Sequence, residues 1–416
     1  MVCRVGLVLA LTGIVGGYAP SLSASELTLE QAVEQALARH PSLTAQLQSV
    51  RAAERQAEVL ALEPPWTAGG ELENVLGTGA VSGIHGAETT LRLSRVIELG
   101  GKRTMRERVG AAEVARQSQS VDRLQVAIAA QAAERYIAVV GHQERLAILR
   151  SDLALAEETR AALTRWIEVG RISEAEAHQA DVAVISARLR VEDAEHELDS
   201  ARVALAALWG DPDPSFEIAK GVLGTLQPVA PFAELAAQLP DSVEQRSFAV
   251  ESDTLLAQRE LAATAARPDL AVSVGIRRLE SIDDQALIMG VSLPLGSAPR
   301  SALGVARIDA ELGALTARQQ AAQWDARQQL YGLYQELEHA LHVVETHQKE
   351  TLPAAEAALA ASRRGFELGR FGFLVLNQAQ QTLIDLRLDV LAAQQRYHTR
   401  LVAIERLTAA NAGDAR

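Results

Sequence analysis

The fold is decided by residues 369–407, which read GRFGFLVLNQAQQTLIDLRLDVLAAQQRYHTRLVAIERL. Apolar side chains recur every seven residues along this stretch, at Leu376, Leu383, Val390, Tyr397 and Ile404. A second apolar series lies three residues after the first, at Ala379, Leu386, Ala393 and Leu407. An apolar seam with alternating steps of three and four residues predicts a coiled-coil helix with a left-handed supercoil. The alanines of the second series would let the partner helix come close.

The same pattern occurs earlier in the chain, at an offset of 199 residues. The segment WIEVGR (166–171) aligns with GFELGR (365–370), so that Gly170 falls on Gly369. The seam positions then fall on Ala177, Val184, Val191, Leu198 and Leu205, and the second series on Ala180, Ala187, Ala194 and Leu208. Self-similarity of this kind predicts two structural repeats. We expect the first repeat over residues 26–210, a linker or equatorial segment over 211–240, and the second repeat over 241–416.

Each repeat is predicted to run as helix, β-hairpin, long helix, turn and helix. In the first repeat, Thr28–Gln31 resembles a capping box that opens a helix ending near Leu62. After it we expect strands over 71–75 and 89–95 and helices over 101–169 and 173–209. The second repeat should have a helix over 242–266, strands over 269–278 and 285–295, a long helix from about 302, and a helix over 373–407. Pro353 lies inside that long helix and should kink it or mark a junction.

Residues 1–25 have the features of a secretory signal peptide. Arg4 precedes an apolar run over residues 5–15, which is too short to cross a bilayer as a helix. Cys3, the only cysteine, lies in this segment, so the exported chain would have neither a disulfide nor a thiolate metal ligand. The formal net charge of −13 argues against a nucleic-acid partner, which needs a basic surface.

The predicted strands carry a membrane signal. In LAVSVGI, residues 270–276, large apolar residues alternate with small or polar ones. A strand between lipid and a lumen has this pattern, and so does a half-buried strand of a soluble sheet. Export, the low aromatic content of 4% and helices too long for a globular core favour the membrane strand. Four strands cannot close a barrel in lipid, so the chain must oligomerise, and three copies would give a barrel of twelve strands.

Several short motifs resemble the TolC-like outer-membrane efflux family over essentially the whole exported chain. LTLEQA at 27–32, Ala36-Leu37 and HPSL at 40–43 look like the N-terminal helix of that family. Its pattern of a glycine followed ten residues later by an alanine recurs as Gly170 with Ala180 and Gly369 with Ala379. ELEN at 71–74 and IELGGKR at 97–103 look like the heavy-metal branch, the Czc-type cobalt–zinc–cadmium components.

The resemblance implies a mainly α chain with a small β part, in which long coiled-coil hairpins and four strands contribute to a homotrimeric duct. The duct would cross the outer-membrane lipid as a 12-stranded barrel and reach through the periplasm as a helical tube. A periplasmic adaptor would meet its tips and join it to an inner-membrane RND transporter. By resemblance, the adaptor contacts are Val169, Gly170, Arg171, Ile172 and Ser173 in the first repeat and Leu368, Gly369, Arg370, Phe371 and Gly372 in the second.

Some members of this family have acidic rings just inside the tips, six and nine residues after the second tip glycine. Here those positions are Val375 and Gln378, so the acidic gate is not carried over. Asn377, Gln378 and Gln381 would instead leave a constriction that is polar but uncharged. Glu176 and Gln179 are the equivalent positions in the first repeat.

The sequence offers no catalytic, cofactor or resident metal site. His339, His342 and His347, near Glu336, Glu338 and Glu345, form the densest group of possible metal ligands. His347 lies on a different helix face from the other two, and the mixed charges of the segment indicate a solvated surface. No arrangement of a nucleophile with its base stands out, and no glycine-rich phosphate loop has the required context. The chain is therefore not expected to be an enzyme.

We expect passive export of divalent heavy-metal cations, a cargo that rests on the subfamily resemblance alone. A multidrug or type I secretion duct of the same fold is an alternative. A periplasmic coiled-coil scaffold without a barrel is a second alternative, although it leaves the two predicted hairpins without a purpose.

Overall fold

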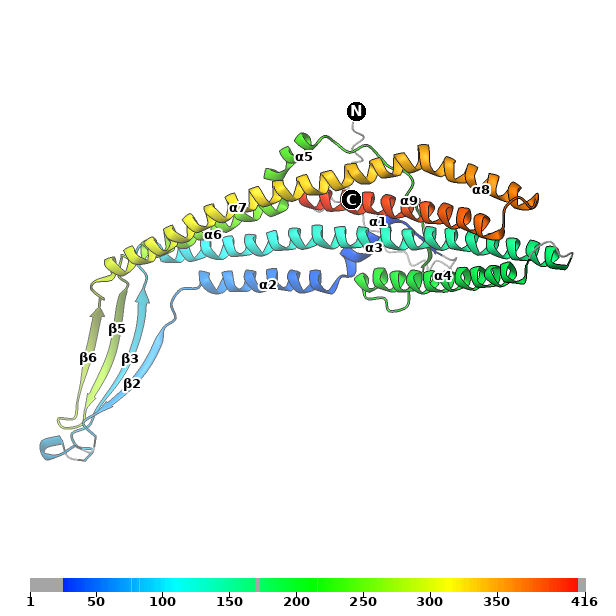
Figure 1. Cartoon of the computed structure of the whole chain (residues 1–416). Coiled ribbons are helices and arrows are strands. Elements are labelled where there is room, and N and C mark those ends of the chain that lie inside the picture. Colours follow the sequence, from blue (N-terminus) through cyan, green and yellow to red (C-terminus); the bar gives the residue numbers. More distant parts are fainter. Residues whose placement is uncertain (1–24, 76, 82, 169–172, 215, 411–416) are drawn as a thin grey trace, which may run out of the picture.

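The computed structural model describes residues 25–410, apart from residues 76, 82, 169–172 and 215. The molecule is elongated, with a sheet at one end and the ends of two helical hairpins at the other (Figure 1). Almost all of the predicted signal segment, residues 1–24, lies outside the described residues. The predicted fold class, mainly helical with a small sheet, is confirmed.

The chain begins with strand β1 (Ser25–Leu27) and helices α1 (Leu29–Arg39) and α2 (Pro41–Ala61). The expected single helix ending near Leu62 is wrong, because the chain breaks between α1 and α2. Pro41 has no N–H to continue α1, and it holds His40 in an extended conformation with ψ 123°. The predicted capping box at Thr28 is confirmed, since the Thr28 hydroxyl accepts from the backbone N–H of Gln31.

The rest of the first repeat comprises strands β2 (Thr67–Glu73) and β3 (Glu88–Ile97) and helices α3 (Lys102–Glu168) and α4 (Glu174–Ala206). Strand β2 begins four residues before the predicted start and ends where Asn74 takes a positive φ of 58°. A 3₁₀ turn (Ala207–Trp209) follows α4, and Gly210 ends it with φ 76°.

The segment predicted only as a linker contains strand β4 (Phe216–Ala219) and helix α5 (Phe232–Gln238). Strand β4 pairs in parallel with β1. The side-chain amide of Gln143, on α3, holds β4 by donating to the carbonyl of Ala219 at 2.9 Å and accepting from its N–H at 2.8 Å. Strand β1 and the segment between the repeats are thereby fixed to the middle of α3.

The second repeat comprises α6 (Val243–Thr264), β5 (Leu270–Leu279), β6 (Asp284–Ser292), α7 (Ser297–Thr346), α8 (Leu352–Glu367) and α9 (Phe373–Thr408). The junction predicted at Pro353 is confirmed. A π-helical turn (His347–Thr351) separates α7 from α8. In a regular helix the proline ring would collide with the carbonyl of Lys349, four residues earlier, and the wider turn avoids this contact.

The sheet has the strand order β2-β3-β5-β6, and each neighbouring pair is antiparallel. Residues opposite each other in the register share a face, as do Gly70, Leu91, Ile276 and Leu287. The apolar sheet face consists of Leu72, Leu91, Leu93, Val274, Ile276, Leu287, Met289 and Val291, each of which is at least 42% exposed. The polar sheet face carries Glu71, Glu73, Glu88, Thr90, Arg92, Ser94, Ser273 and Arg277.

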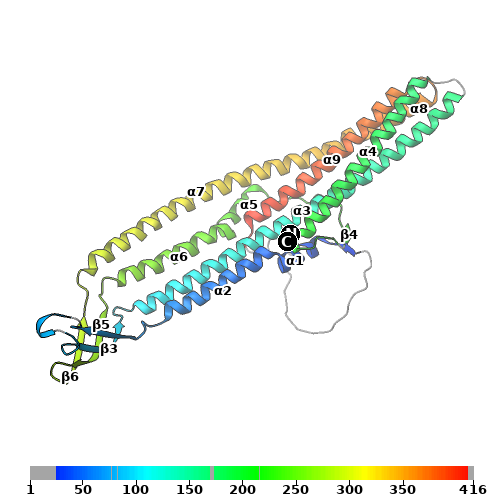
Figure 2. The same cartoon turned by 90° about the horizontal axis from the view of Figure 1, so that it is seen from below.

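The helices continue the sheet as a single curved layer. Next to the sheet they lie side by side in the order α2-α3-α6-α7, which matches the order of the strands joined to them (Figure 2). Toward the tips the order is α4-α3-α9, followed by α8 and the adjoining end of α7 (Figure 1). We call β2, α2 and α4 the first edge of the layer, and β6, α8 and the sheet-proximal part of α7 the second edge. Within the described residues, each edge packs laterally on one side only.

The first series of the predicted coiled-coil seam is buried in both repeats, except at Ala177, which is half-buried. On α9, the five seam residues are 0–7% exposed, at Leu376, Leu383, Val390, Tyr397 and Ile404. On α4, the buried positions are Ala180, Val184, Ala187, Val191, Ala194, Leu198 and Leu205. Helix α4 packs on α3, and α9 packs on α7, α8 and α3. Burial of large apolar side chains, at about 1.5–3 kcal/mol each, therefore holds the hairpins together.

Among the residues that the structure describes, no helix has both the length and the apolar composition needed to span a bilayer.

Candidate functional site

The second tip is a tight reversal between α8 and α9. Gly369 takes φ +67°, a left-handed conformation that strains other residues. The N–H of Arg370 donates to the carbonyl of Gly365 at 2.8 Å, which closes the end of α8. A Cβ atom on Gly365 would lie 2.2 Å from the ring of Phe371, so the ring packs there only because the residue is glycine.

Apolar side chains project from this tip into solvent. We call Leu368, Phe371, Leu374 and Val375 the tip patch; they are 68%, 48%, 65% and 44% exposed. Four neighbouring apolar residues at this exposure suit a protein contact better than water. In the first tip, Val169, Gly170, Arg171 and Ile172 lie outside the described residues. Ser173 lies at the start of α4 as its N-cap, and its hydroxyl accepts from the N–H of Glu176.

Glu176 joins the two tips. Its carboxylate accepts from the backbone N–H of Ser173 at 3.2 Å, which completes a capping box at the start of α4. The same carboxylate accepts from the backbone N–H of Phe373, the first residue of α9, at 3.2 Å. A small apolar cluster beneath this contact holds the hairpins side by side; it contains Leu163, Ala180, Phe366, Phe373 and Leu376.

The other residues of the predicted constriction divide into two groups. Gln179, Val375 and Gln378 are exposed, and Asn377 is half-buried. Gln381 is bound, because its side-chain oxygen accepts from the guanidinium of Arg190 at 3.3 Å. The structure therefore brings Glu176 and Gln381 into contacts between the two repeats. The exposed residues Gln179, Val375 and Gln378 lie on the surface of the tip region.

A polar layer between the repeats was not anticipated from the sequence. The carboxylate of Asp152, whose side chain is 4% exposed, pairs with Arg190 at 2.7 Å. Burial raises the pKa of Asp152 above its ordinary value, Arg190 opposes this shift, and the nearby Asp385 adds to it. One heptad closer to the tips, the buried Gln380 donates to the hydroxyl of Thr159 at 3.0 Å. This layer separates the apolar cluster at the tips from the main core.

The histidines near the end of α7 form no metal site. His339 and His342 are exposed, and the ring of His347 lies 2.7 Å from the hydroxyl of Thr351 within the π-helical turn. Among the described residues, no group of three or more His, Cys, Asp or Glu side chains is arranged to hold a metal ion.

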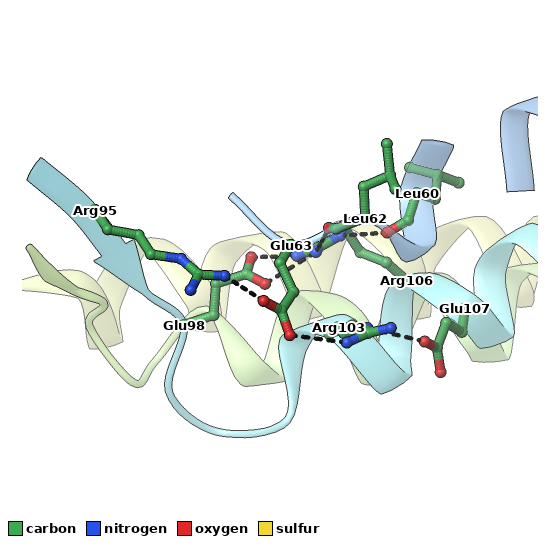
Figure 3. A network of polar contacts seen from close by, with 8 residues as sticks. All are labelled: Leu60, Leu62, Glu63, Arg95, Glu98, Arg103, Arg106 and Glu107. Atoms are coloured by element: carbon green, nitrogen blue, oxygen red, sulfur yellow. Dashed lines mark hydrogen bonds and ion pairs between the residues drawn. The ribbon is translucent and has the colours of Figure 1, made fainter. Parts of the chain in front are cut away.

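A second polar network fixes the corner between the sheet and the helices (Figure 3). Arg106, on α3, donates to the carbonyl of Leu60 at 2.8 Å and to that of Leu62 at 3.0 Å, which satisfies the end of α2. Its guanidinium also pairs with Glu98, in the turn between β3 and α3. Glu63 joins Arg95 to Arg103 beside this group. The angle at which the sheet leaves the helices is therefore set by side chains of β3, α3 and the two connecting segments, together with backbone carbonyls at the end of α2.

The sequence and the fold were both compared with those of known proteins. No family model matches the chain. The cobalt-zinc-cadmium resistance protein CzcC of Cupriavidus metallidurans is 29% identical over 325 residues, which are 77% of this chain and 76% of that protein. The structure of CusC, described with its transmembrane channel formation, matches with a TM-score of 0.77 at 16% identity over 91% of both chains. The open-state outer membrane channel MtrE of Neisseria gonorrhoeae matches with a TM-score of 0.71 at 18% identity, over 95% of this chain and 94% of that one.

The two structural matches establish the fold, and the sequence match adds the metal-resistance branch that ELEN and IELGGKR had indicated. The proteins that the chain resembles are channel and resistance proteins, not enzymes. The chain therefore resembles the TolC-like outer-membrane efflux proteins in fold and the heavy-metal resistance protein CzcC in sequence.

Proposed function

We propose that three copies of this chain form an outer-membrane duct through which divalent heavy-metal cations leave the periplasm. The duct is the outermost part of a tripartite RND efflux system. Transport through it is passive, because the energy is supplied by the inner-membrane transporter.

The observation that carries this proposal is that both edges of the layer of strands and helices lack a lateral partner. The apolar sheet face has no helix against it within the described residues, and the strands β2 and β6 each have one unpaired edge. In lipid every backbone N–H and C=O needs a partner inside the protein, so such a sheet must close on further strands. Joining the first edge of one copy to the second edge of the next satisfies both edges, and three copies give twelve strands.

In such a ring the polar sheet face lines the lumen. Arg277 pairs there with Glu88 at 2.7 Å and with Glu73 at 3.0 Å, and Arg92 lies 3.8 Å from Glu71. A charged, hydrated wall suits small cations that keep their water shell. Such a wall needs no resident metal site to conduct them.

The cargo is inferred from sequence similarity. CzcC is a cobalt-zinc-cadmium resistance protein, whereas the structural matches concern the fold alone. We therefore assign divalent heavy metals as the cargo class. Selection among them belongs to the inner-membrane transporter.

The tips are the proposed docking site of the periplasmic adaptor. The tip patch supplies apolar contact area, and Arg370 adds a cation beside it. By analogy between the repeats, residues 169–173 would supply the second contact of each subunit. The exposed Gln179 and Gln378, with Asn377, would line the polar mouth just inside the tips.

A deletion strain tests the proposal. Cellular accumulation of Zn, Co, Cd, Ni and Cu is measured beside a panel of dyes and antibiotics, with the wild-type gene restored as the control. We expect metal accumulation to rise in the deletion strain and dye accumulation to stay constant. A rise in dyes or antibiotics alone would assign the duct to a multidrug system. Recovery of the protein only as a periplasmic species without heat-resistant oligomers would favour the scaffold.

A further inference from the structure

We propose that α2 of one copy packs against α7 of the next copy in a defined register, with Ala52 against Ala310 and Val59 against Leu303. The inference rests on the proposed ring and goes beyond it, because it names the contact surface and its axial register. Its basis is the internal repeat: a helix contact seen within the chain serves as the template for one between chains.

The covalent path of the chain brings these two helices to the joint. Helix α2 leads directly into β2, the outermost strand of the first edge, and β6, the outermost strand of the second edge, leads directly into α7. Only residues 62–66 and 293–296 separate the strands from the helices. If β6 pairs with β2 of the next copy, α7 must therefore lie beside α2 of that copy.

Within the chain, the same relationship joins the two repeats. Strand β3 of the first repeat pairs with β5 of the second, and α3 accordingly packs on α6. By repeat, α3 corresponds to α7 and α6 to α2. The contact between α3 and α6 is thus the template for the contact between α7 and α2 of the next copy.

Two matched contacts fix the residue correspondence. Arg106 of α3 approaches α2 at Leu60, whose carbonyl accepts from its Nε at 2.8 Å. Gly304 of α7 approaches α6 at Ala262, whose methyl group lies 3.7 Å from the position of a Cβ on Gly304. Gly304 is 198 residues after Arg106, and Ala262 is 202 residues after Leu60. The N-caps His40 of α2 and Ser242 of α6 are also 202 residues apart.

The offset of 198 residues in α7 differs by one from the offset of 199 between Gly170 and Gly369. The π-helical turn at residues 347–351 lies between these two regions. A π turn accommodates one more residue than an α turn, so it accounts for the change in offset. The correspondence is therefore consistent from the sheet to the tips.

The contact between α3 and α6 that corresponds to the proposed joint lies at Thr254 and Ala112. The hydroxyl of Thr254, on α6, lies 3.4 Å from the carbonyl of Ala112, on α3. Ala52 is 202 residues before Thr254, and Ala310 is 198 residues after Ala112. Both Ala52 and Ala310 are exposed in the single chain. Their small side chains would let the two helices approach closely.

The neighbouring heptad gives independent support. Seven residues from Ala52 toward the sheet lies Val59, which is 57% exposed, and seven residues from Ala310 toward the sheet lies Leu303, which is 74% exposed. Two large apolar residues that no element covers thus occur at matching positions on opposite edges of one chain. The register that pairs the alanines buries both of them. A second copy is the partner that satisfies both edges at once.

Cysteine pairs test the register in the full chain, extracted from outer-membrane fractions. Cys3 is the only native cysteine, so background crosslinking is small. We expect the double variant Ala52→Cys with Ala310→Cys to give disulfide-linked dimers and trimers under oxidising conditions. Either single variant should give none. The pair Ala112→Cys with Thr254→Cys is the matched control, because it has the template geometry inside one chain and should oxidise without leaving the monomer band.

A pair shifted by one heptad checks the register itself. Ala45→Cys with Ala310→Cys places the sulfurs about 10 Å further apart along the helix, beyond the reach of a disulfide. The proposal would be overturned if Ala45→Cys with Ala310→Cys gave a ladder of disulfide-linked dimers and trimers and Ala52→Cys with Ala310→Cys gave none. The absence of any ladder while the Ala112→Cys and Thr254→Cys control oxidises would also overturn it. A ladder in cells that show no metal phenotype would support the interface and count against the proposed cargo.

Discussion

The carboxylate of Glu176, on α4, accepts a hydrogen bond from the backbone N–H of Phe373, the first residue of α9, 197 residues later in the chain. The N-cap of α9 is Gly372, so no N-cap side chain supports the start of this helix. Glu176 also completes the capping box of α4 with Ser173. One carboxylate therefore serves the N-termini of two helices from different repeats, and it fixes the position of one tip relative to the other.

Replacing Glu176 with Ala should loosen both helix starts. Loss of a capping side chain costs about 1 kcal/mol, and here two helix ends lose a partner. We expect the amide of Phe373 to exchange hydrogen several-fold faster, as measured by exchange with mass spectrometry on the assembled protein. Glu174→Ala, in the same helix turn, is the control and should leave Phe373 unchanged. Equal exchange in wild type and Glu176→Ala would remove the bridging role.

Replacing Arg190 with Met should destabilise the helical region strongly. Asp152 would then be buried without its partner, which typically costs about 3–5 kcal/mol. Adding Asp152→Asn should recover much of the loss, since the amide carries no charge. Thermal unfolding of the four proteins of this double-mutant cycle measures the coupling. A coupling near zero would show that the pair is solvated in the assembled protein.

Replacing Gly369 with Leu should abolish export while leaving the oligomer in the membrane. The positive φ of Gly369 disfavours any side chain by about 1–2 kcal/mol, so the reversal at the tip must rearrange. Metal accumulation and heat-resistant oligomers are measured together. Gly332→Ala, on α7 with no atom within 4 Å of the new Cβ, is the control and should retain both. Full export by Gly369→Leu would count against the tip as the adaptor site.

Replacing Arg106 with Lys should weaken the corner between the sheet and the helices, although the charge is kept. A lysine ammonium cannot reach Leu60, Leu62 and Glu98 together in the planar geometry of a guanidinium. We expect a loss of about 1–2 kcal/mol in thermal stability and faster proteolysis near residues 60–66. Arg55→Lys, on the exposed face of α2, is the matched control. Unchanged cleavage in Arg106→Lys would show that the network of Figure 3 does not hold this corner.

Glu405, on α9, should make stability depend on pH. Burial raises the pKa of its carboxyl to about 7 in the folded protein. Ionising a group whose folded pKa is raised costs stability, and this cost grows as the pH rises from the unfolded pKa toward about 7. Glu405→Gln should therefore be more stable than wild type above pH 7, by about 3 kcal/mol, and equal to it near pH 4. Melting temperatures from pH 4 to 9 check this, with the exposed Glu54→Gln as the control.

The long elements were predictable from sequence because their patterns repeat many times. The seam from Leu376 to Ile404 contains enough heptads to fix both the helix and its buried face. Pro353 indicated a junction because a proline inside a helix removes a backbone hydrogen bond and clashes with the preceding turn. Pro41 did not indicate a break in the sequence pattern. Proline is tolerated in the first turn of a helix, and α2 begins at Pro41.

Contacts between distant segments could not be predicted. Strands β1 and β4 are three and four residues long, and a parallel pairing across most of the first repeat leaves no local pattern. The capping box at Ser173 and Glu176 has a readable spacing, but the additional contact of Glu176 with Phe373 depends on how two repeats meet. Asp152 and Thr159 are buried polar residues one heptad apart on α3, but Arg145, one heptad before Asp152, is exposed, so their burial could not be read from the sequence pattern.

The π-helical turn at residues 347–351 distinguishes the second hairpin of each chain from the first. Two similar repeats in each of three chains would supply six nearly equivalent hairpins around one axis. The first hairpin of each chain has one continuous helix, α3, where the second has α7, the π-helical turn and α8, so the two hairpins are similar but not identical. Neighbouring hairpins therefore alternate, and the tube has threefold rather than sixfold symmetry. A protein that docks around the tips meets two kinds of site in alternation, so six identical molecules could not all bind in the same way.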